Sequence, residues 1–176
     1  MLEIKGNLWE MDSWQDGNGK LIQVERDTAA VWICITTNGE IKRDGKAVMG
    51  AGIAKNARDR YKGVDAVLAE KLKARGNRVS YLQDAPEFGT KGRLLSFPTK
   101  DEWKKPSSLK LIEESARELK AQFLRAKAHY SSSKEIQKLL VVVPRPGCNN
   151  GKLNWADVRK VIEPIFDTDE FLIISK

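Results

Sequence analysis

The sequence predicts an α/β fold of three layers, with helices on both faces of one central sheet. Two continuous apolar runs, Val31–Ile35 and Leu139–Val143, are typical of strands that are buried on both faces. Amphipathic helical patterns stand between and after these runs, and such an alternation of strands and helices is what a layered α/β domain requires. Because 176 residues suit one domain with a full-sized core, we expect a single domain over residues 1–176.

The chain before residue 40 is predicted to form three strands. An alternating apolar pattern over residues 2–9 indicates the first strand. A hairpin signal at Asp16–Gly19 precedes a second strand at residues 21–25. The third strand is the buried run that begins at Val31, and it ends at the polar turn Thr36–Gly39.

Two short helices and two strands are predicted in the middle of the chain. Apolar residues recur three and four positions apart after Gly52 and again from Val64. Gly76 suits the C′ position that ends the second of these helices. Residues 78–83 and 93–97 have the pattern of strands on either side of a loop.

A long helix, a last helix and a last strand complete the prediction. The long helix starts after Ser108, and one face of it carries an apolar stripe made of Leu109, Ile112, Ala116, Leu119 and Phe123. His129, the only histidine, is expected in an exposed linker after this helix, and its isolation argues against a catalytic triad. Asn154 is expected to cap the last helix, Pro164 to end it, and residues 171–174 to form the last strand.

The composition bounds the class of partner and the compartment. A net charge of +7 and a pI of about 9.4 would attract nucleic acid, although an ordinary solvated surface explains the charge equally well. No apolar run approaches the roughly 20 residues of a membrane span, and the N-terminus lacks the layout of a signal peptide. Cys34 and Cys148 make neither a disulfide framework nor a zinc site, so we expect a cytoplasmic protein with no metal and no cofactor.

Two glycine-rich turns point to a ligand. Residues Val48–Ala54 open a helical pattern, and residues Pro144–Lys152 follow the second apolar strand and lead into a helix. Bare backbone N–H groups beside a helix start form an anion site. Ligands of layered α/β sheets lie beyond the carboxyl ends of the strands, where both turns can meet the turn Thr36–Asn38. The turns therefore predict a nucleotide-like ligand whose diphosphate lies between them.

Each turn taken alone also has a structural explanation. Gly50 and Gly52 suit any tight turn into a helix. The segment Gly147–Lys152 resembles a Walker A loop, but three rather than four residues separate its glycines and no Ser or Thr follows its lysine. The chain also lacks a G-x-G-x-x-G motif with a downstream acid. These features exclude a P-loop ATPase and argue against a dinucleotide-binding Rossmann domain.

A lysine at the end of a predicted strand is the candidate nucleophile. Pro98 and Thr99 end the strand, which places Lys100 at the sheet edge where the ligand is expected. A lysine near apolar residues such as Phe97 and Trp103 can act as a nucleophile or base, although by spacing alone an ordinary surface lysine explains the pattern better. Cys148 is expected to pack against backbone rather than to attack a substrate, since no histidine lies near it in sequence.

Four segments in this order resemble a macrodomain, the ADP-ribose-binding fold. They are Lys5–Leu8, Ile35–Asn38, Met49–Ala54 and Pro144–Trp155. Within that family the chain is most similar to the branch of terminal ADP-ribose glycohydrolases and of the antitoxins that reverse DNA ADP-ribosylation. The resemblance implies a three-layer α/β/α macrodomain with a central mixed, largely parallel sheet.

The resemblance also implies a ligand and a mechanism. In that branch the lysine of a Thr-Lys pair is catalytic, and Lys100 matches it, so its amine is expected to attack C1″ of the distal ribose and open the ribose into a covalent intermediate that water resolves. The implied ligand-binding residues are Asn7, Leu8, Thr36, Thr37, Asn38, Met49, Gly50, Ala51, Gly52, Ile53, Ala54, Thr99, Pro144, Arg145, Gly147, Cys148, Asn149, Asn150, Gly151 and Leu153.

Three departures from the family pattern bear on the substrate. Asn7 stands where many macrodomains have an aspartate for the adenine amine. Gly151 stands where one relative has a second catalytic acid, and that acid is also absent from the DNA-directed antitoxins. The loop Gly39–Lys46 looks longer than in the glycohydrolases and borders the distal ribose.

The leading interpretation is a monomeric hydrolase that removes ADP-ribose from a macromolecule, with nucleic acid (DNA) as the favoured one. The open alternatives are a reader that binds ADP-ribose without turnover, a hydrolase of protein-linked ADP-ribose and a phosphatase of ADP-ribose 1″-phosphate. A general RNA- or DNA-binding protein is disfavoured, because aromatic-rich strand motifs are absent. Lys100 is the residue that separates the enzyme from the reader.

Overall fold

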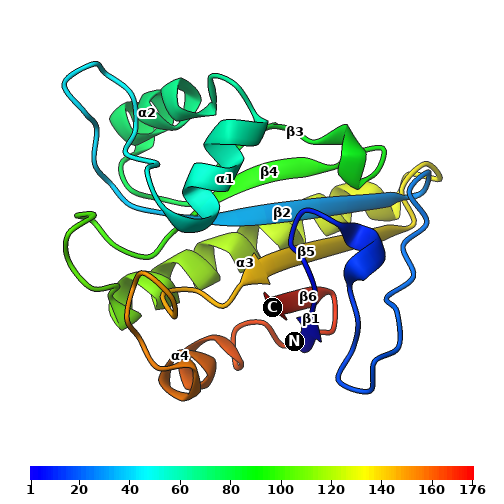
Figure 1. The fold of residues 1–176 in the computed structure, drawn as a ribbon. Coiled ribbons are helices and arrows are strands. Elements are labelled where there is room, and N and C mark those ends of the chain that lie inside the picture. Colours follow the sequence, from blue (N-terminus) through cyan, green and yellow to red (C-terminus); the bar gives the residue numbers. More distant parts are fainter.

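The structure, a computed structural model, describes all residues 1–176 and places a six-stranded sheet between two layers of helices (Figure 1). The strands are β1 (Leu2–Lys5), β2 (Ala29–Thr37), β3 (Ser80–Asp84), β4 (Arg93–Pro98), β5 (Lys138–Pro144) and β6 (Phe171–Ser175). The helices are α1 (Gly52–Arg60), α2 (Val64–Arg75), α3 (Leu109–Ser131) and α4 (Trp155–Ile162), with short 3₁₀ turns η1 (Met11–Ser13) and η2 (Pro86–Phe88). The predicted three-layer α/β architecture is confirmed.

The sheet is mixed and largely parallel. Its strand order is β1-β6-β5-β2-β4-β3, and every neighbouring pair is parallel except β3 and β4. The carboxyl ends of the parallel strands therefore lie at one edge. The loops that follow β2, β4 and β5 gather there, on the left of Figure 1.

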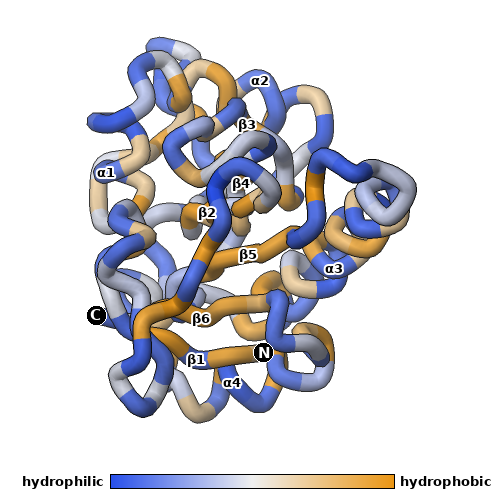
Figure 2. Tube along the Cα trace, turned by 90° about the vertical axis from the view of Figure 1, so that its right-hand side faces the viewer, coloured by the Kyte–Doolittle hydropathy of each residue, from blue (hydrophilic) through white to orange (hydrophobic).

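Each face of the sheet carries its own core, and β2 supplies both. Alternate β2 side chains such as Ile33 pack toward α1 and α2, while their neighbours, such as Trp32 and Cys34, pack toward α3 and α4. Strands with two buried faces are apolar along their length, which explains the continuous hydrophobic runs (Figure 2). None of the helices combines the length and the apolar character that a membrane span needs.

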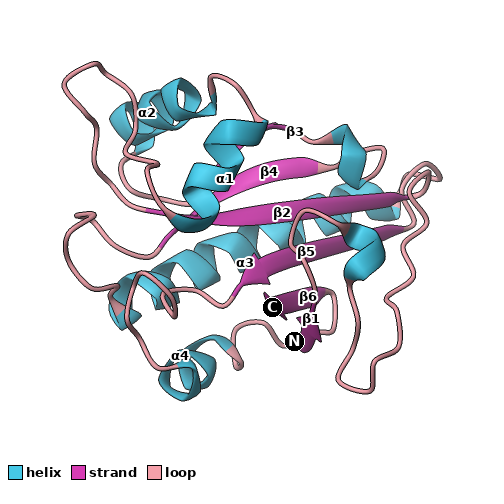
Figure 3. Cartoon of the chain, in the orientation of Figure 1, coloured by secondary structure: helices cyan, strands magenta, loops and turns pink.

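Figure 3 shows where each helix begins and ends, and the chemistry of the terminal residues accounts for three of these ends. The Ser108 hydroxyl accepts a hydrogen bond from the N–H of Leu111 at the start of α3, and the Asn154 side chain accepts one from the N–H of Ala156 at the start of α4. Gly76 ends α2 with a φ of +78°, a conformation that costs a glycine little. These three ends were predicted.

Three expectations about local structure are wrong. Residues 21–25 form no strand, because Leu21 makes only an isolated bridge to Gln15 and no neighbouring strand lies alongside the segment. The first strand is shorter than residues 2–9, since the chain turns at Gly6, which has a φ of +146°. His129 lies in the last turn of α3 rather than in a linker, although it is exposed as expected.

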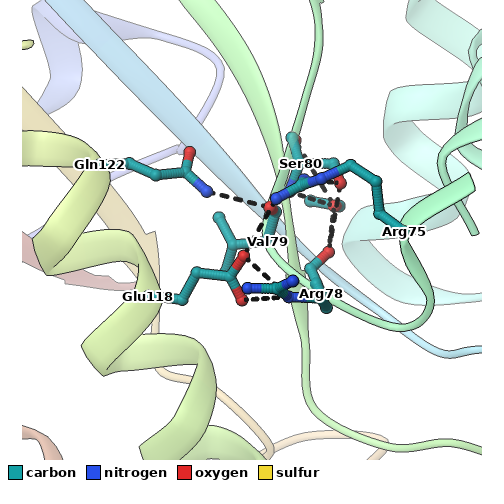
Figure 4. A network of polar contacts seen from close by, with 7 residues as sticks. Arg75, Arg78, Val79, Ser80, Glu118 and Gln122 are labelled. Atoms are coloured by element: carbon teal, nitrogen blue, oxygen red, sulfur yellow. Dashed lines mark hydrogen bonds and ion pairs between the residues drawn. The ribbon is translucent and has the colours of Figure 1, made fainter.

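A polar cluster joins the α2–β3 connection to α3 (Figure 4). Glu118 on α3 accepts from Arg75 at 3.2 Å and from Arg78 at 3.3 Å. The backbone carbonyl of Val79 accepts from Arg75 at 2.8 Å and from the side chain of Gln122 at 3.0 Å. The short connection between α2 and β3 is thereby held against the opposite helical layer.

Candidate functional site

Two adjoining cavities cross the carboxyl ends of the strands. One cavity of about 670 Å³ lies beside the ends of β2 and β4, and another of about 900 Å³ lies beside the ends of β1 and β6. Both are lined by residues of α1 and of the loop after β5, namely Ile53, Pro144, Arg145, Cys148 and Asn149. The two cavities therefore form one continuous cleft of the size that small-molecule ligands occupy.

The cleft brings together every ligand residue that the sequence predicted. The first cavity is lined by Thr36, Thr37, Asn38, Met49, Gly50, Ala51, Gly52, Ile53, Ala54, Thr99, Lys100, Pro144, Arg145, Gly147, Cys148, Asn149, Asn150 and Gly151. The second cavity is lined by Asn7, Leu8 and Leu153 in addition. These residues thus all line one cleft, and their contacts with a ligand stay predictions.

The first glycine turn presents a run of unpaired backbone donors. No N–H group from Met49 to Ala54 donates a hydrogen bond within the protein, and α1 has no side-chain cap. Gly52 begins α1 with a φ of +58°, which turns the chain sharply into the helix. Free N–H groups and the helix dipole both favour an anion at this helix start.

The second glycine turn presents a similar run. The N–H groups from Gly147 to Gly151 have no acceptor, while the turn is closed by hydrogen bonds from Lys152 to Asn149 (3.1 Å) and from Leu153 to Gly147 (2.8 Å). Both runs belong to residues that line the first cavity. Two sets of N–H donors beside one cavity make a site for an anion with several oxygens, such as a diphosphate.

Lys100 lies two residues after the end of β4, and hydrogen bonds hold the backbone on both sides of it. The N–H of Thr99 donates to the carbonyl of Thr37 at 3.0 Å, and the side chain of Asn77 donates to the carbonyl of Lys100 at 3.1 Å. Its amine donates to the carbonyls of Trp103 (3.2 Å) and Asn150 (3.4 Å). The lysine therefore bridges the loop after β4 and the second glycine turn.

The expected apolar neighbours do not enclose this amine. Phe97 is fully buried in the core between the sheet and the α3/α4 layer, and Trp103 is half exposed. The polar contacts of the amine are with backbone oxygens. The resting position of Lys100 is thus set by hydrogen bonds between two loops.

Lysine is the main nucleophilic residue type in the first cavity. No Asp, Glu or His lines that cavity. Burial raises the pKa of the Cys148 thiol, and the opposing effect of Arg145 is smaller, so this cysteine is a poor nucleophile near neutral pH. Of the lysines that line the cavity, Lys100 is partly buried and the other three are exposed.

The second cavity is polar and aromatic. The side-chain oxygen of Asn7 accepts a hydrogen bond from the N–H of Trp9 at 3.0 Å, and Arg60 lies over the Trp9 ring at 5.0 Å. Arg145 lies over the ring of Trp155 at 4.7 Å. Asn7 is therefore held in place by its own turn, and its oxygen keeps a second lone pair for a ligand donor.

Several residues of the cleft escaped prediction. They are Lys104, Lys105, Pro106 and Ser107 in the first cavity, and Trp9, Asn56, Asp59, Arg60, Ile174, Ser175 and Lys176 in the second. The basic run from Lys104 was visible in the sequence, but its charge alone could not separate a cleft from a solvated surface. The contact of Asn77 with Lys100 could not be predicted from neighbouring residues, since Asn77 reaches Lys100 from another loop.

Comparison with solved structures identifies proteins of the same architecture. The chain superposes on DarTG of Thermosipho africanus in complex with ADP-ribose with a TM-score of 0.60 and 21% identity, over 85% of this chain and 38% of that one. The macrodomain of Mycobacterium tuberculosis DarG gives 0.61 and 22%, over 92% and 97% of the two chains. The macrodomain of Thermus aquaticus DarG gives 0.62 and 20%, over 99% and 97%. No protein-family model and no curated protein sequence matches the chain.

Proposed function

We propose that this chain, which has the macrodomain fold, binds ADP-ribose and hydrolyses the bond that links it to a macromolecule, namely DNA, with Lys100 as the nucleophile. The observation that carries the proposal is the pair of unpaired N–H runs, Met49–Ala54 and Gly147–Gly151, on either side of a cavity that also contains Lys100. Donors for a diphosphate and a nucleophile for its distal sugar are thereby within one cleft.

We propose one direction for the ligand in the cleft. The diphosphate binds between the two glycine turns, where the N–H donors are. The adenine end occupies the second cavity, where Asn7 accepts from the adenine amine, and the distal ribose lies in the first cavity beside Asn38 and Lys100. One long ligand is favoured over two small ones because the cavities are continuous.

The reaction uses the amine of Lys100 and water. The neutral amine forms a bond to C1″ as the link to the macromolecule breaks, and the leaving group takes up the proton that the nitrogen releases. Opening of the ribose gives a Schiff base, and water hydrolyses it to return the amine and free ADP-ribose. No carboxylate lines the first cavity, so lysine rather than an acid is the group to supply this chemistry.

A reader of ADP-ribose is the second candidate. It is favoured by the resting contacts of Lys100, whose amine is held by the carbonyls of Trp103 and Asn150 rather than left free.

We also propose that the protein works as a monomer in the cytoplasm, and the support for a reducing compartment is that both cysteines are free.

The experiment is release of ADP-ribose from modified DNA, RNA and protein by the wild type, Lys100→Ala and Lys100→Arg. We expect release from DNA by the wild type and none by either variant, because a guanidinium stays protonated and alanine has no nucleophile. ADP-ribose affinity of Lys100→Ala, measured by calorimetry, should stay within about tenfold of wild type, or ~1.4 kcal/mol. Borohydride should trap a wild-type adduct.

Three results would refute parts of this proposal. Absence of any heat of binding at millimolar ADP-ribose would refute ADP-ribose as the ligand. Full turnover by Lys100→Ala on every substrate that the wild type cleaves would refute Lys100 as the nucleophile. A wild type that binds ADP-ribose and releases none from any substrate would establish the reader in place of the enzyme.

A further inference from the structure

The mouth of the first cavity carries more positive charge than a bound diphosphate uses. Its lining includes the cations Lys100, Lys104, Lys105, Arg145 and Lys152, and neither Asp nor Glu is among the lining residues. The backbone N–H runs already supply donors for a diphosphate. The excess cations are therefore available to phosphates that do not belong to ADP-ribose.

Apart from the proposed nucleophile Lys100, two of these cations lack a carboxylate partner within the protein. Lys105 pairs with Glu102 at 3.0 Å, and Arg145 pairs with Glu3 at 3.5 Å. Lys104 and Lys152 make no ion pair, and both are exposed. A phosphate could pair with either lysine without displacing an existing partner.

The indole ring of Trp103 lines the same cavity as these lysines and the proposed nucleophile. Trp103 is 50% exposed, and its backbone is held by the carboxylate of Glu40, which accepts from its N–H at 3.0 Å. Its carbonyl accepts from the Lys100 amine at 3.2 Å. The ammonium of Lys104 lies over the ring at 5.4 Å. An anchored and exposed ring of this kind suits stacking of a nucleobase.

The backbone of Lys152 has a conformation that is strained for a residue with a side chain. Lys152 is the one non-glycine residue with a positive φ, at +62°. The left-handed conformation costs a side-chain-bearing residue about 1–2 kcal/mol, and glycine adopts it freely. Strain of this kind concentrates at functional sites. An unpaired, exposed lysine in a strained position beside the cavity therefore has a use other than stabilising the turn.

We propose that Trp103, Lys104 and Lys152, here called the strand rim, bind single-stranded DNA that carries the ADP-ribose. The base at the modified position stacks on Trp103, and the flanking phosphates pair with the two lysines. A single strand is required because a base inside a duplex presents no free face to an indole. The inference rests on the proposed function and deepens it by naming the residues that recognise the strand.

The test measures binding of a fluorescent single-stranded oligodeoxynucleotide without ADP-ribose, by anisotropy at several salt concentrations. Trp103→Ala should weaken binding about tenfold or more, while Trp103→Phe keeps most of it because a ring remains. Lys104→Ala and Lys152→Gly should each reduce the slope of log K against log salt by about 0.7. Each variant should lose more affinity for the oligonucleotide than for free ADP-ribose, measured by calorimetry.

Stability separates recognition from a structural role. Lys152→Gly relieves the left-handed strain, so its Tm should not fall even though strand binding weakens. Lys91→Ala is the matched charge control, because Lys91 is exposed before the amino end of β4, away from the cleft. Leu124→Ala on α3, 52% exposed, is the control for loss of an apolar surface group. Neither control should alter strand binding.

The outcomes distinguish this inference from the proposed function. Wild-type binding to duplex as tight as to single strand, or undiminished binding by Trp103→Ala and Lys152→Gly, would overturn the strand rim. Equal losses of ADP-ribose release from modified protein and from modified DNA in these variants would also overturn it. Strand binding that depends on the rim, in a protein that releases no ADP-ribose, would support the rim while refuting the hydrolase.

Discussion

Substitution of Gly151 by alanine tests how tightly the second glycine turn is packed. A Cβ at this position would lie 2.1 Å from the Ser107 hydroxyl oxygen and 2.6 Å from the carbonyl oxygen of Gly147. The hydroxyl can rotate, but both backbones are held, because Ser107 N–H donates to the Gly151 carbonyl at 3.0 Å and the Gly147 carbonyl accepts from Leu153 at 2.8 Å. The turn itself must therefore move.

The magnitude follows from the cost of overpacking. Forcing an extra methyl into a packed site costs about 1–3 kcal/mol, and in a domain of this size each kcal/mol lowers Tm by about 2–4 °C, so we expect a loss of ~2–12 °C. Displacement of the turn also misaligns the N–H groups from Gly147 to Gly151, so ADP-ribose affinity should fall at least about tenfold. Thermal unfolding and calorimetry measure the two effects.

The control is Gly17→Ala, since a Cβ at Gly17 meets nothing within 4 Å and the φ of this residue is not positive. It should leave Tm equal to or slightly above that of the wild type. Gly151→Ala with wild-type Tm and affinity would refute the packing argument. The same contacts predict that any larger side chain at Gly151 must displace Ser107 or the carbonyl of Gly147.

Two further predictions concern single side chains of the cleft. Asn7→Asp should raise ADP-ribose affinity about fivefold in calorimetry, because a carboxylate accepts from the adenine amine more strongly than an amide does, by about 1 kcal/mol; a weaker complex would contradict the adenine placement. Cys148 should react with iodoacetamide at pH 8 more slowly in the native protein than in denaturant, because its raised pKa leaves less thiolate at a given pH; equal rates by mass spectrometry would contradict the burial argument.

The parts of the fold that the sequence predicted are those with strong local signals. The two-sided burial of β2 and β5 leaves uninterrupted apolar runs, and the caps at Ser108 and Asn154 mark helix starts by their own hydrogen bonds. The false strand at residues 21–25 shows the limit of such signals. Its alternation arises because Ile22 and Val24 pack against the core from a loop, without a strand partner.

The candidate site likewise has a part that the sequence predicted and a part that it did not. The two glycine turns were predicted from their glycines, because few other residues allow a φ near that of Gly52 or Gly147. The strand rim and the contact of Asn77 with Lys100 depend on loops that are distant in sequence and meet only in the folded chain. Such contacts are set by the topology of the sheet, so single-sequence patterns do not contain them.

The unpaired N–H groups give the cleft a built-in reporter. Since no acceptor in the protein protects Met49–Ala54 or Gly147–Gly151, their amide hydrogens should exchange rapidly with deuterated water in the ligand-free state. A bound anion would slow exchange at these two short segments, which mass spectrometry can resolve. Candidate ligands can therefore be ranked by where they protect the backbone, without an assay of turnover.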